Sequence, residues 1–359
     1  MKQRTISLVT VCMNRLHHLQ QTLPRNMSDN EGYEHLEFVV LDYNSTDGLG
    51  EWINSHMKAY IDNGRLQYYH TLEPACYHPA HSRNMAFLLS TGQLVCNVDA
   101  DNYSGRHFAA YLNNRFCENE KSVLITFGGS RQLAPKDAYG RVCITRDDFI
   151  AVNGYDECID LYCGEDIDLA KRVMRLGRET VVIEESAFLH TIAHNDTERI
   201  RQMPLLKMIA ACYLMPEANG FSRVLFLFFN GRFVLVTLRG HGQRTPGWQD
   251  AVDEGQYVAD AGGLQLFFEQ DFTWQLRSGE SRQILSFSSD KFTRFFYQVT
   301  ADDGLSSWAI QYMLRHIKTH HFDNRKVNTS GFGHGTVFHN FDYSHPLPVS
   351  PAINSVTNE

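Results

Sequence analysis

Runs of apolar residues alternate with amphipathic stretches through about the first 200 residues of the chain. Short apolar runs predict strands, and apolar residues at helical spacing, such as Leu16, Leu19 and Leu23, predict helices between them. Strands are predicted at 6–13, 36–41, 65–70 and 93–98, and helices at 15–23, 50–61 and 80–90. This alternation predicts right-handed crossovers and a mostly parallel, doubly wound, Rossmann-like α/β sheet.

The pattern changes after this part of the chain. A helix is predicted at 204–213 and a linker at 216–220. Beyond it, strands are predicted at 223–229 and 232–238, joined at Asn230-Gly231 by a two-residue type I′ turn. Further strands follow at 264–268, 272–276, 283–287 and 294–299, with a helix at 308–318. We therefore expect a first domain over 1–215, a smaller β-rich domain over 221–340 and a disordered tail over 341–359.

Composition excludes several classes of protein. A net charge of −8 with no basic cluster argues against nucleic acid as a partner. The eight cysteines contain no Cys-x-x-Cys pair, which disfavours a zinc ribbon and favours reduced thiols in the cytoplasm. No apolar run is long enough to form a transmembrane segment, and the apolar N-terminal run is too short for a signal peptide. We expect a cytoplasmic protein, with the inner face of the membrane as a candidate site of peripheral attachment.

Polar side chains gather where the predicted strands end. The carboxyl edge of an open α/β sheet is where such folds bind ligands. The residues at this edge are Thr10, Asn14, Asp42, Asp99 and Asp101. Asp99-Ala100-Asp101 follows a buried strand, and two acids there suit a divalent cation that in turn holds phosphate oxygens. The sequence has neither Gly-x-Gly-x-x-Gly nor Gly-Lys-Ser/Thr, so the dinucleotide and P-loop classes are excluded, and Arg83 is the best-placed cation for phosphate.

A second acidic motif begins at Gly164-Glu165-Asp166. An apolar stripe follows it and predicts a helix that ends at Gly177. Glu165 and Asp166 would lie at the helix N-terminus, where the macrodipole favours their ionised form. An ionised carboxylate facing a cleft can act as a general base toward a hydroxyl. The alternative interpretation is that these acids only cap the helix.

Five motifs occur in an order that resembles the family 2 glycosyltransferases of GT-A fold. They are 7–15, 40–47, 82–86, Asp99-Ala100-Asp101 and Gly164-Glu165-Asp166. The segment 154–177 is similar to the catalytic half of chondroitin-type polymerases and of β-1,4-galactosyltransferases. The sequence departs from the family at Tyr43, where a second acid is usual.

The resemblance implies a role for each motif residue. Thr10 and Asp42 would contact uracil and ribose, and Arg83 the base or phosphate. Asn14 and Glu165 would belong to the same donor-binding set. Asp99 would touch the ribose and the metal shell, Asp101 would ligate Mn²⁺ or Mg²⁺, and Asp166 would be the catalytic base. The resemblance also implies that a histidine completes the metal site, here His190 with His194 as the alternative, and an imidazole suits Mn²⁺.

The function that we expect is a metal-dependent, inverting transfer of a sugar from a nucleoside-diphosphate sugar, with UDP as the favoured nucleotide. The sugar would be a hexose or an N-acetylhexosamine, and the acceptor a hydroxyl of a glycan or lipid-linked glycan in surface polysaccharide synthesis. Two alternatives stay open. A sugar nucleotidyltransferase would need a Gly-rich basic loop after the first strand, and a carbohydrate-binding protein would have no need of Asp99, Asp101, Asp166 and His190 together.

The β-rich domain has its own candidate roles. It could bind glycan, position an acceptor or mediate homodimerisation. Exposed aromatic residues could stack on sugar rings, although aromatic residues in strands are mostly core residues. The candidates are Trp248, Trp274 and Tyr257. A histidine cluster at His316, His320 and His321 has metal-binding spacing, but a solvated helix face explains it more simply.

Overall fold

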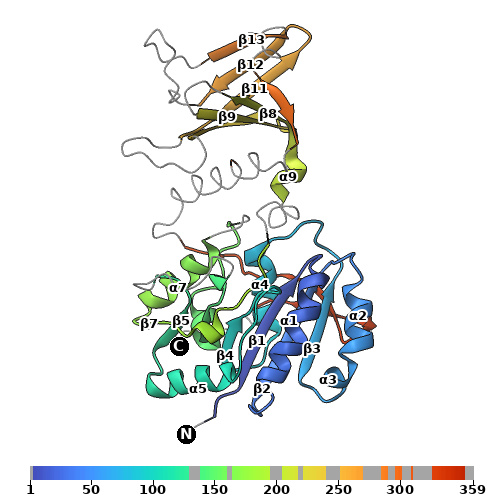
Figure 1. Cartoon of the computed structure of the whole chain (residues 1–359), viewed down its shortest axis with the longest axis vertical. Coiled ribbons are helices and arrows are strands. Elements are labelled where there is room, and N and C mark those ends of the chain that lie inside the picture. The colour runs from blue at the N-terminus through green and yellow to red at the C-terminus, as the bar shows by residue number, and fades with distance from the viewer. Residues whose placement is uncertain are drawn as a thin grey trace, which may run out of the picture. The chain divides into compact units, whose positions relative to one another are not determined.

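The chain divides into two compact units. The computed structural model describes residues 3–128, 138–159, 164–194, 204–216, 221–239, 251–269, 284–289, 296–300, 309 and 326–351. The first unit joins residues 1–193 to residues 324–359, and the second contains residues 194–323 (Figure 1). The two ends of the chain therefore belong to one unit.

The first unit contains a nine-stranded sheet with the order β16-β15-β3-β2-β1-β4-β6-β5-β7. Its strands are β1 Ile6–Cys12, β2 Leu36–Tyr43, β3 Leu66–Thr71, β4 Leu94–Asn97, β5 Ser122–Ile125, β6 Cys143–Thr145, β7 Glu179–Val182, β15 Gly335–His339 and β16 Asp342–Val349. The central strands β3, β2, β1 and β4 are parallel. Antiparallel strands flank them, because β6 pairs antiparallel with β4 and β5, and β15 with β3 and β16. The predicted α/β class with a parallel central sheet is confirmed.

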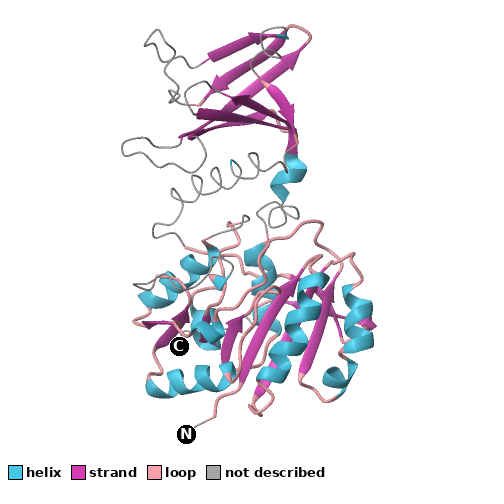
Figure 2. Ribbon diagram, in the orientation of Figure 1, coloured by secondary structure: helices cyan, strands magenta, loops and turns pink. Residues whose placement is uncertain are grey.

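Helices pack around this sheet (Figure 2). They are α1 Leu16–Asp29, α2 Leu49–His56, α3 Lys58–Asp62, α4 Pro79–Leu89, α5 Phe108–Glu118, α6 Arg146–Ala151, α7 Glu165–Arg175 and a 3₁₀ helix Ser186–Phe188. Helix α1 continues beyond the predicted end at residue 23, through Pro24. An interior proline costs a helix about 3 kcal/mol, and the burial of Leu23 and Met27 on either side of it offsets that cost. The helix predicted at 50–61 is divided at Met57 into α2 and α3.

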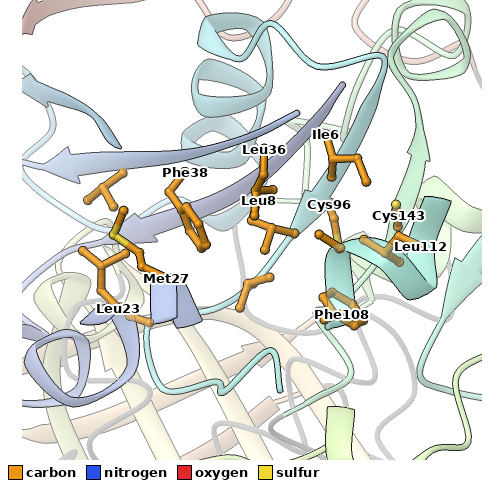
Figure 3. Packing of buried hydrophobic residues seen from close by; sticks show 14 of the residues in the cluster. Ile6, Leu8, Leu23, Met27, Leu36, Phe38, Cys96, Phe108, Leu112 and Cys143 are labelled. Atoms are coloured by element: carbon orange, nitrogen blue, oxygen red, sulfur yellow. The ribbon is translucent and has the colours of Figure 1, made fainter. Parts of the chain in front are cut away.

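The core lies on both faces of the sheet because side chains of a strand alternate between faces. In β1, Ile6 and Leu8 join one buried cluster, whereas Val9 and Val11 join the other. Figure 3 shows the first cluster, in which Leu8 and the neighbouring strands meet side chains from α1 and α5. Because both faces are covered, polar side chains of these strands are placed mainly at the strand ends.

The second unit contains a seven-stranded antiparallel sheet with the order β13-β12-β11-β10-β9-β8-β14. Its elements are α9 Pro204–Met208, β8 Ile209–Pro216, β9 Phe221–Phe228, β10 Arg232–Arg239, β11 Ala251–Asp260, β12 Gly263–Phe268, β13 Ile284–Ser288 and β14 Tyr297–Val299. The predicted β-rich character is confirmed. The helix predicted at 204–213 ends at Met208, and β8 follows, because the next residues pair with β9.

The predicted β9–β10 hairpin is present, but its turn differs from the prediction. Leu227 pairs with Phe233, and of the turn residues Gly231 has a positive φ of 79°. A type I′ turn needs two positive φ values, whereas a longer loop with one left-handed glycine matches this geometry. Tyr257 is half-buried and donates its hydroxyl to the Phe228 carbonyl at 3.1 Å, so it is a packing residue.

The expectation of a disordered tail over 341–359 is wrong for residues 342–349, which form β16. The burial of Val337 and Val349 joins this hairpin to the core. Pro346 and Pro348 are tolerated because β16 is an edge strand. A proline has no N–H to donate, and an edge strand can accept it without losing a hydrogen bond of the sheet. Residues 326–340, expected in the second domain, belong to the first unit.

Several expectations lie outside the described residues. They are the strand at 272–276, most of the helix at 308–318, Trp248, Trp274, His316, His320 and His321. In the part of the chain that the structure describes, no helix has the length and hydropathy to cross a membrane.

Candidate functional site

The loops that follow β1 and β2 are joined by polar side chains. Thr10 donates its hydroxyl to the Val98 carbonyl at 2.7 Å, which ties β1 to the end of β4. Asn14 has a φ of 55°, and its Oδ1 accepts from the Thr46 backbone N–H at 2.7 Å. The Asn14 backbone N–H donates to Ser45 Oγ at 3.1 Å. Thr10 and Asn14 therefore shape the edge of the sheet by bonding to the protein itself.

Asp42 is a buried carboxylate near the end of β2. Its Oδ1 accepts from the Ser45 backbone N–H, and its Oδ2 accepts from the Tyr68 hydroxyl, both at 2.8 Å. Burial raises the pKa of Asp42, although these hydrogen bonds act in the opposite direction. Asp42 also lines a pocket of about 280 Å³.

Arg83 of α4 is buried and bridges the two acidic motifs. Its Nη1 donates to Glu165 Oε1 and to Asp166 Oδ1, each at 2.9 Å. Its Nη2 donates to Asp99 Oδ1, also at 2.9 Å. One guanidinium thus joins the end of β4 to the first turn of α7. The structure places Arg83 among three carboxylates, and its contact with base or phosphate stays a prediction.

The balance of charge around Arg83 sets the protonation of Asp166. Burial raises the pKa of Asp166 well above its usual value, and the neighbouring Glu165 and Asp99 act in the same direction, against the lowering by Arg83. The sequence predicted that the helix macrodipole would favour the ionised form. Burial among other acids outweighs the effect of the macrodipole on the pKa, because the macrodipole effect is modest. A carboxylate with a raised pKa is a stronger base when ionised.

Asp99 is held in place by a close backbone approach. Its Oδ1 accepts from Asn97 Nδ2 at 2.8 Å, and Asn97 also donates to the Gly140 carbonyl at 2.9 Å. A Cβ atom at Gly140 would lie 2.2 Å from Asp99 Oδ2 and 3.0 Å from Arg83 Nη2. A larger residue here would require the Asp99 carboxylate to shift. No motif in the sequence marked Gly140.

Asp101 and His190 lie on neighbouring stretches of chain. An antiparallel bridge pairs Asn102 with Thr191, the Tyr103 N–H donates to the His190 carbonyl at 3.0 Å, and the Ile192 N–H donates to the Asp101 carbonyl at 2.8 Å. This register makes Asp101 and His190 diagonal neighbours on one face of the bridge.

The side chains at this edge of the sheet include carboxylates and an imidazole that could bind a cation. Among the described residues, no three His, Cys, Asp or Glu side chains form a cluster that could hold a metal ion. A carboxylate with an imidazole does fit a divalent cation that takes its remaining ligands from substrate phosphates. The pair predicted from the sequence is Asp101 and His190, which the bridge places on one face.

Arg141 is a buried residue near the site that sequence reasoning missed. Its Nη2 donates to Asn102 Oδ1 at 3.1 Å and to the Tyr103 carbonyl at 3.0 Å, so it fixes the segment that follows Asp101. Its Nε and Nη1 have no hydrogen-bond partner in the described part of the chain, and burial lowers its pKa. Burial of a charged group without full hydrogen bonding is costly. Arg141 lies in no motif, so no sequence signal marks it.

The segment that follows residue 326 fixes the loop before α7. Asn328 donates its amide to the Asn153 and Tyr155 carbonyls at 2.7 and 2.6 Å. The Gly333 N–H donates to Glu157 Oε1 at 2.6 Å. The C-terminal segment therefore helps to position the loop that leads toward Glu165 and Asp166.

Two family models match the first unit. Residues 7–143 match the family described as glycosyl transferase family 2, and residues 134–195 match the one described as the N-terminal domain of galactosyltransferase. No curated protein matches the chain.

Solved structures show more distant similarity. The mannosyltransferase PcManGT from Pyrobaculum calidifontis, in complex with GDP-Man and Mn²⁺, is 17% identical with a TM-score of 0.46, over 57% of this chain and 63% of that chain. TarS 1–349 from S. aureus, in complex with UDP-GlcNAc, is 17% identical with a TM-score of 0.44, over 53% of this chain and 59% of that chain. This chain thus spans less than two thirds of the length of each. The two family matches together run from residue 7 to residue 195, so this part of the chain is similar to glycosyltransferase domains, with residues 7–143 similar to those of family 2.

Proposed function

We propose that this protein is a metal-dependent, inverting glycosyltransferase that moves a hexose or N-acetylhexosamine from a UDP-sugar to a hydroxyl of a glycan in surface polysaccharide synthesis. The observation that carries the proposal is the bridge made by Arg83. It joins Asp99, at the strand end where phosphate would lie, to Asp166, which would face the acceptor. A donor-binding acid and a candidate base thus share one rigid, buried cation.

The donor side of the site is assigned to Asp99, Asp101 and His190. They follow β4 or lie beside the segment after it, at the edge where α/β sheets bind ligands. Asp101 and His190 would hold Mn²⁺, with Asp99 beside it. A divalent cation held there would offset the negative charge that develops on the departing diphosphate.

The acceptor side is assigned to Asp166. One of its oxygens, Oδ1, is bound by Arg83, which fixes the carboxylate and leaves Oδ2 for the acceptor hydroxyl. The hydroxyl proton would pass to the carboxylate as the oxygen bonds to the anomeric carbon and the bond to the diphosphate breaks. A single displacement inverts the anomeric centre. The second unit would serve the acceptor or join two copies of the chain.

Binding of nucleotide sugars tests this function. We expect a UDP-sugar with Mn²⁺ at about 100 times its Kd to stabilise the protein by about 2.7 kcal/mol, which raises Tm by roughly 5–10 °C. Chelation of the metal should abolish the shift. Asp101→Asn should also abolish it, whereas Asp62→Asn, which alters an exposed acid in α3, should not. The proposal fails if no sugar nucleotide shifts Tm in the wild-type protein.

A further inference from the structure

The turn between β15 and β16 has an unusual residue at its centre. His339 pairs with Asp342, and the two residues between them, Asn340 and Phe341, have φ values of 45° and 67°. Two positive φ values define a type I′ turn, in which Asn-Gly is preferred. Asparagine fits the first position, but a bulky phenylalanine at the second is an outlier. Backbone strain of this kind is often retained at ligand sites.

The ring of Phe341 has a specific place in the first unit. It stacks on Tyr68 with ring centroids 4.6 Å apart and an interplanar angle of 20°. The turn is fixed to β3, because the Tyr68 N–H donates to Asn340 Oδ1 at 2.9 Å and the Asn340 N–H donates to the Tyr68 carbonyl at 2.8 Å. The Tyr68 hydroxyl in turn donates to Asp42. The strained turn therefore presents an aromatic ring beside the buried carboxylate.

The side chains of Asp42, Tyr68 and Phe341 line the pocket of about 280 Å³, together with His70 and Tyr343. Tyr343 is half exposed, and its hydroxyl lies 3.2 Å from His70 Nδ1. His70 Nε2 is buried and has no hydrogen-bond partner in the part of the chain that the structure describes. Gly50 leaves room for this arrangement, since a Cβ there would lie 3.1 Å from the Tyr68 hydroxyl. The pocket thus combines aromatic walls with a carboxylate and an imidazole.

The size and position of the pocket favour the nucleoside part of a sugar nucleotide as its ligand. The volume lies just below the usual range for ligand sites, which suits a base with its ribose rather than a whole sugar nucleotide. Asp42 lies near the end of β2, and β1 separates β2 from β4, so the strand of Asp42 lies roughly 10 Å from the strand that leads to Asp99 by the usual strand spacing. A nucleoside at Asp42 would leave its diphosphate directed toward Asp99 and Asp101.

We propose that the C-terminal hairpin completes the donor site, with Phe341 and Tyr343 forming the aromatic wall against which the nucleoside of the sugar nucleotide binds. This inference rests on the proposed function. It assigns donor binding to residues about 300 positions after Asp42, in a segment that lies outside both family matches.

Phe341→Gly tests the inference, because glycine is the preferred residue at this turn position and only the ring is lost. Titration calorimetry of the full-length protein with UDP and Mn²⁺ should show affinity weakened roughly 5- to 150-fold, the usual effect of losing a base–aromatic contact. Tm without ligand should be unchanged or higher. KM for the UDP-sugar should rise while kcat at saturation stays within about twofold.

Three further variants complete the experiment. Phe341→Tyr keeps the ring and should bind UDP like the wild type. Tyr343→Ala changes an exposed side chain and should weaken binding without unfolding the protein. Leu347→Ala, on the same hairpin but outside the pocket, should leave the affinity unchanged.

The outcomes separate this inference from the proposed function. If the wild type binds no sugar nucleotide, the proposed function is wrong and this inference falls with it. If the wild type binds UDP and both Phe341→Gly and Tyr343→Ala bind it equally well, only this inference is overturned. A rise in KM for the acceptor without weaker UDP binding would also overturn this inference, because the pocket would then hold the acceptor.

Discussion

The two units of the protein differ in how they bury charged side chains. In the first unit, one edge of the sheet buries Arg83, Glu165, Asp166 and Arg141 close to one another. In the second unit, the described strands bury chiefly apolar side chains, with Arg223 and Asp253 as buried charged residues, and β12 alternates buried and exposed residues as a sheet with one packed face does. Folding alone does not require a buried acidic cluster, which costs free energy. The contrast supports the proposal that these charges of the first unit serve in chemistry, whereas the second unit is organised around packing.

The largest effect should come from deleting each region in turn. Replacing 194–323 by a Gly/Ser linker of about 15 residues, which spans roughly 20 Å, should leave UDP-sugar binding intact. Ending the chain at residue 323 should abolish binding, because it removes β15 and β16 from the nine-stranded sheet. Calorimetric titration of both proteins with UDP checks this. Equal binding by both would show that the C-terminal segment is dispensable.

Removing the central cation should destabilise the first unit. Arg83→Met leaves three carboxylates without their shared partner, and loss of one member of a buried ion pair costs about 3–5 kcal/mol. Urea unfolding provides the measurement. The control is Lys58→Met, which breaks an exposed pair with Asp62 and should change stability by less than about 1 kcal/mol. Similar small effects for both variants would mean that the acidic cluster does not depend on Arg83.

A smaller change can test the placement of Asp99. Gly140→Ala would force a Cβ against Asp99 Oδ2, so we expect overpacking to cost about 1–3 kcal/mol and donor affinity to fall. Gly32→Ala is a matched control, since no atom lies within 4 Å of its added Cβ. Donor affinity that is unchanged in Gly140→Ala would show that the position of Asp99 is not important for binding.

The smallest effect concerns pH. In the proposed mechanism, transfer requires ionised Asp166, so kcat should rise with pH through the pKa of this group, and the raised pKa places that acid limb above the ordinary aspartate value of about 3.9. The pH profile of kcat provides the check. An acid limb at the ordinary value would show that Arg83 or the bound substrate outweighs the effect of burial.

The sequence predicted the parts of the fold that depend on local pattern. The alternation of strands and helices placed β1 to β4 within a few residues, and the Asp99-Ala100-Asp101 and Gly164-Glu165-Asp166 motifs marked both ends of the Arg83 bridge. Contacts between distant segments could not be read in this way. The return of β15 and β16 to β3 depends on pairing across more than 260 residues, and the prolines of β16 suggested a tail.

The site also depends on contacts between distant segments, which the sequence does not reveal. Arg83 was recognised as a cation, but its three carboxylate partners come from two other elements, so its role as a bridge could not be predicted. Gly140 and Arg141 have no motif, and their importance follows only from what they touch: Asp99 for the first, and the segment after Asp101 for the second.

Asp166→Asn tests the central claim most directly, because it keeps the size of the side chain and removes its ability to accept the acceptor proton. The measurement compares UDP-sugar binding by calorimetry with the rate of sugar transfer in the same protein. We expect binding close to that of the wild type and a fall in kcat of about 10²- to 10⁴-fold. Normal transfer by Asp166→Asn would contradict the assignment of this residue as the catalytic base.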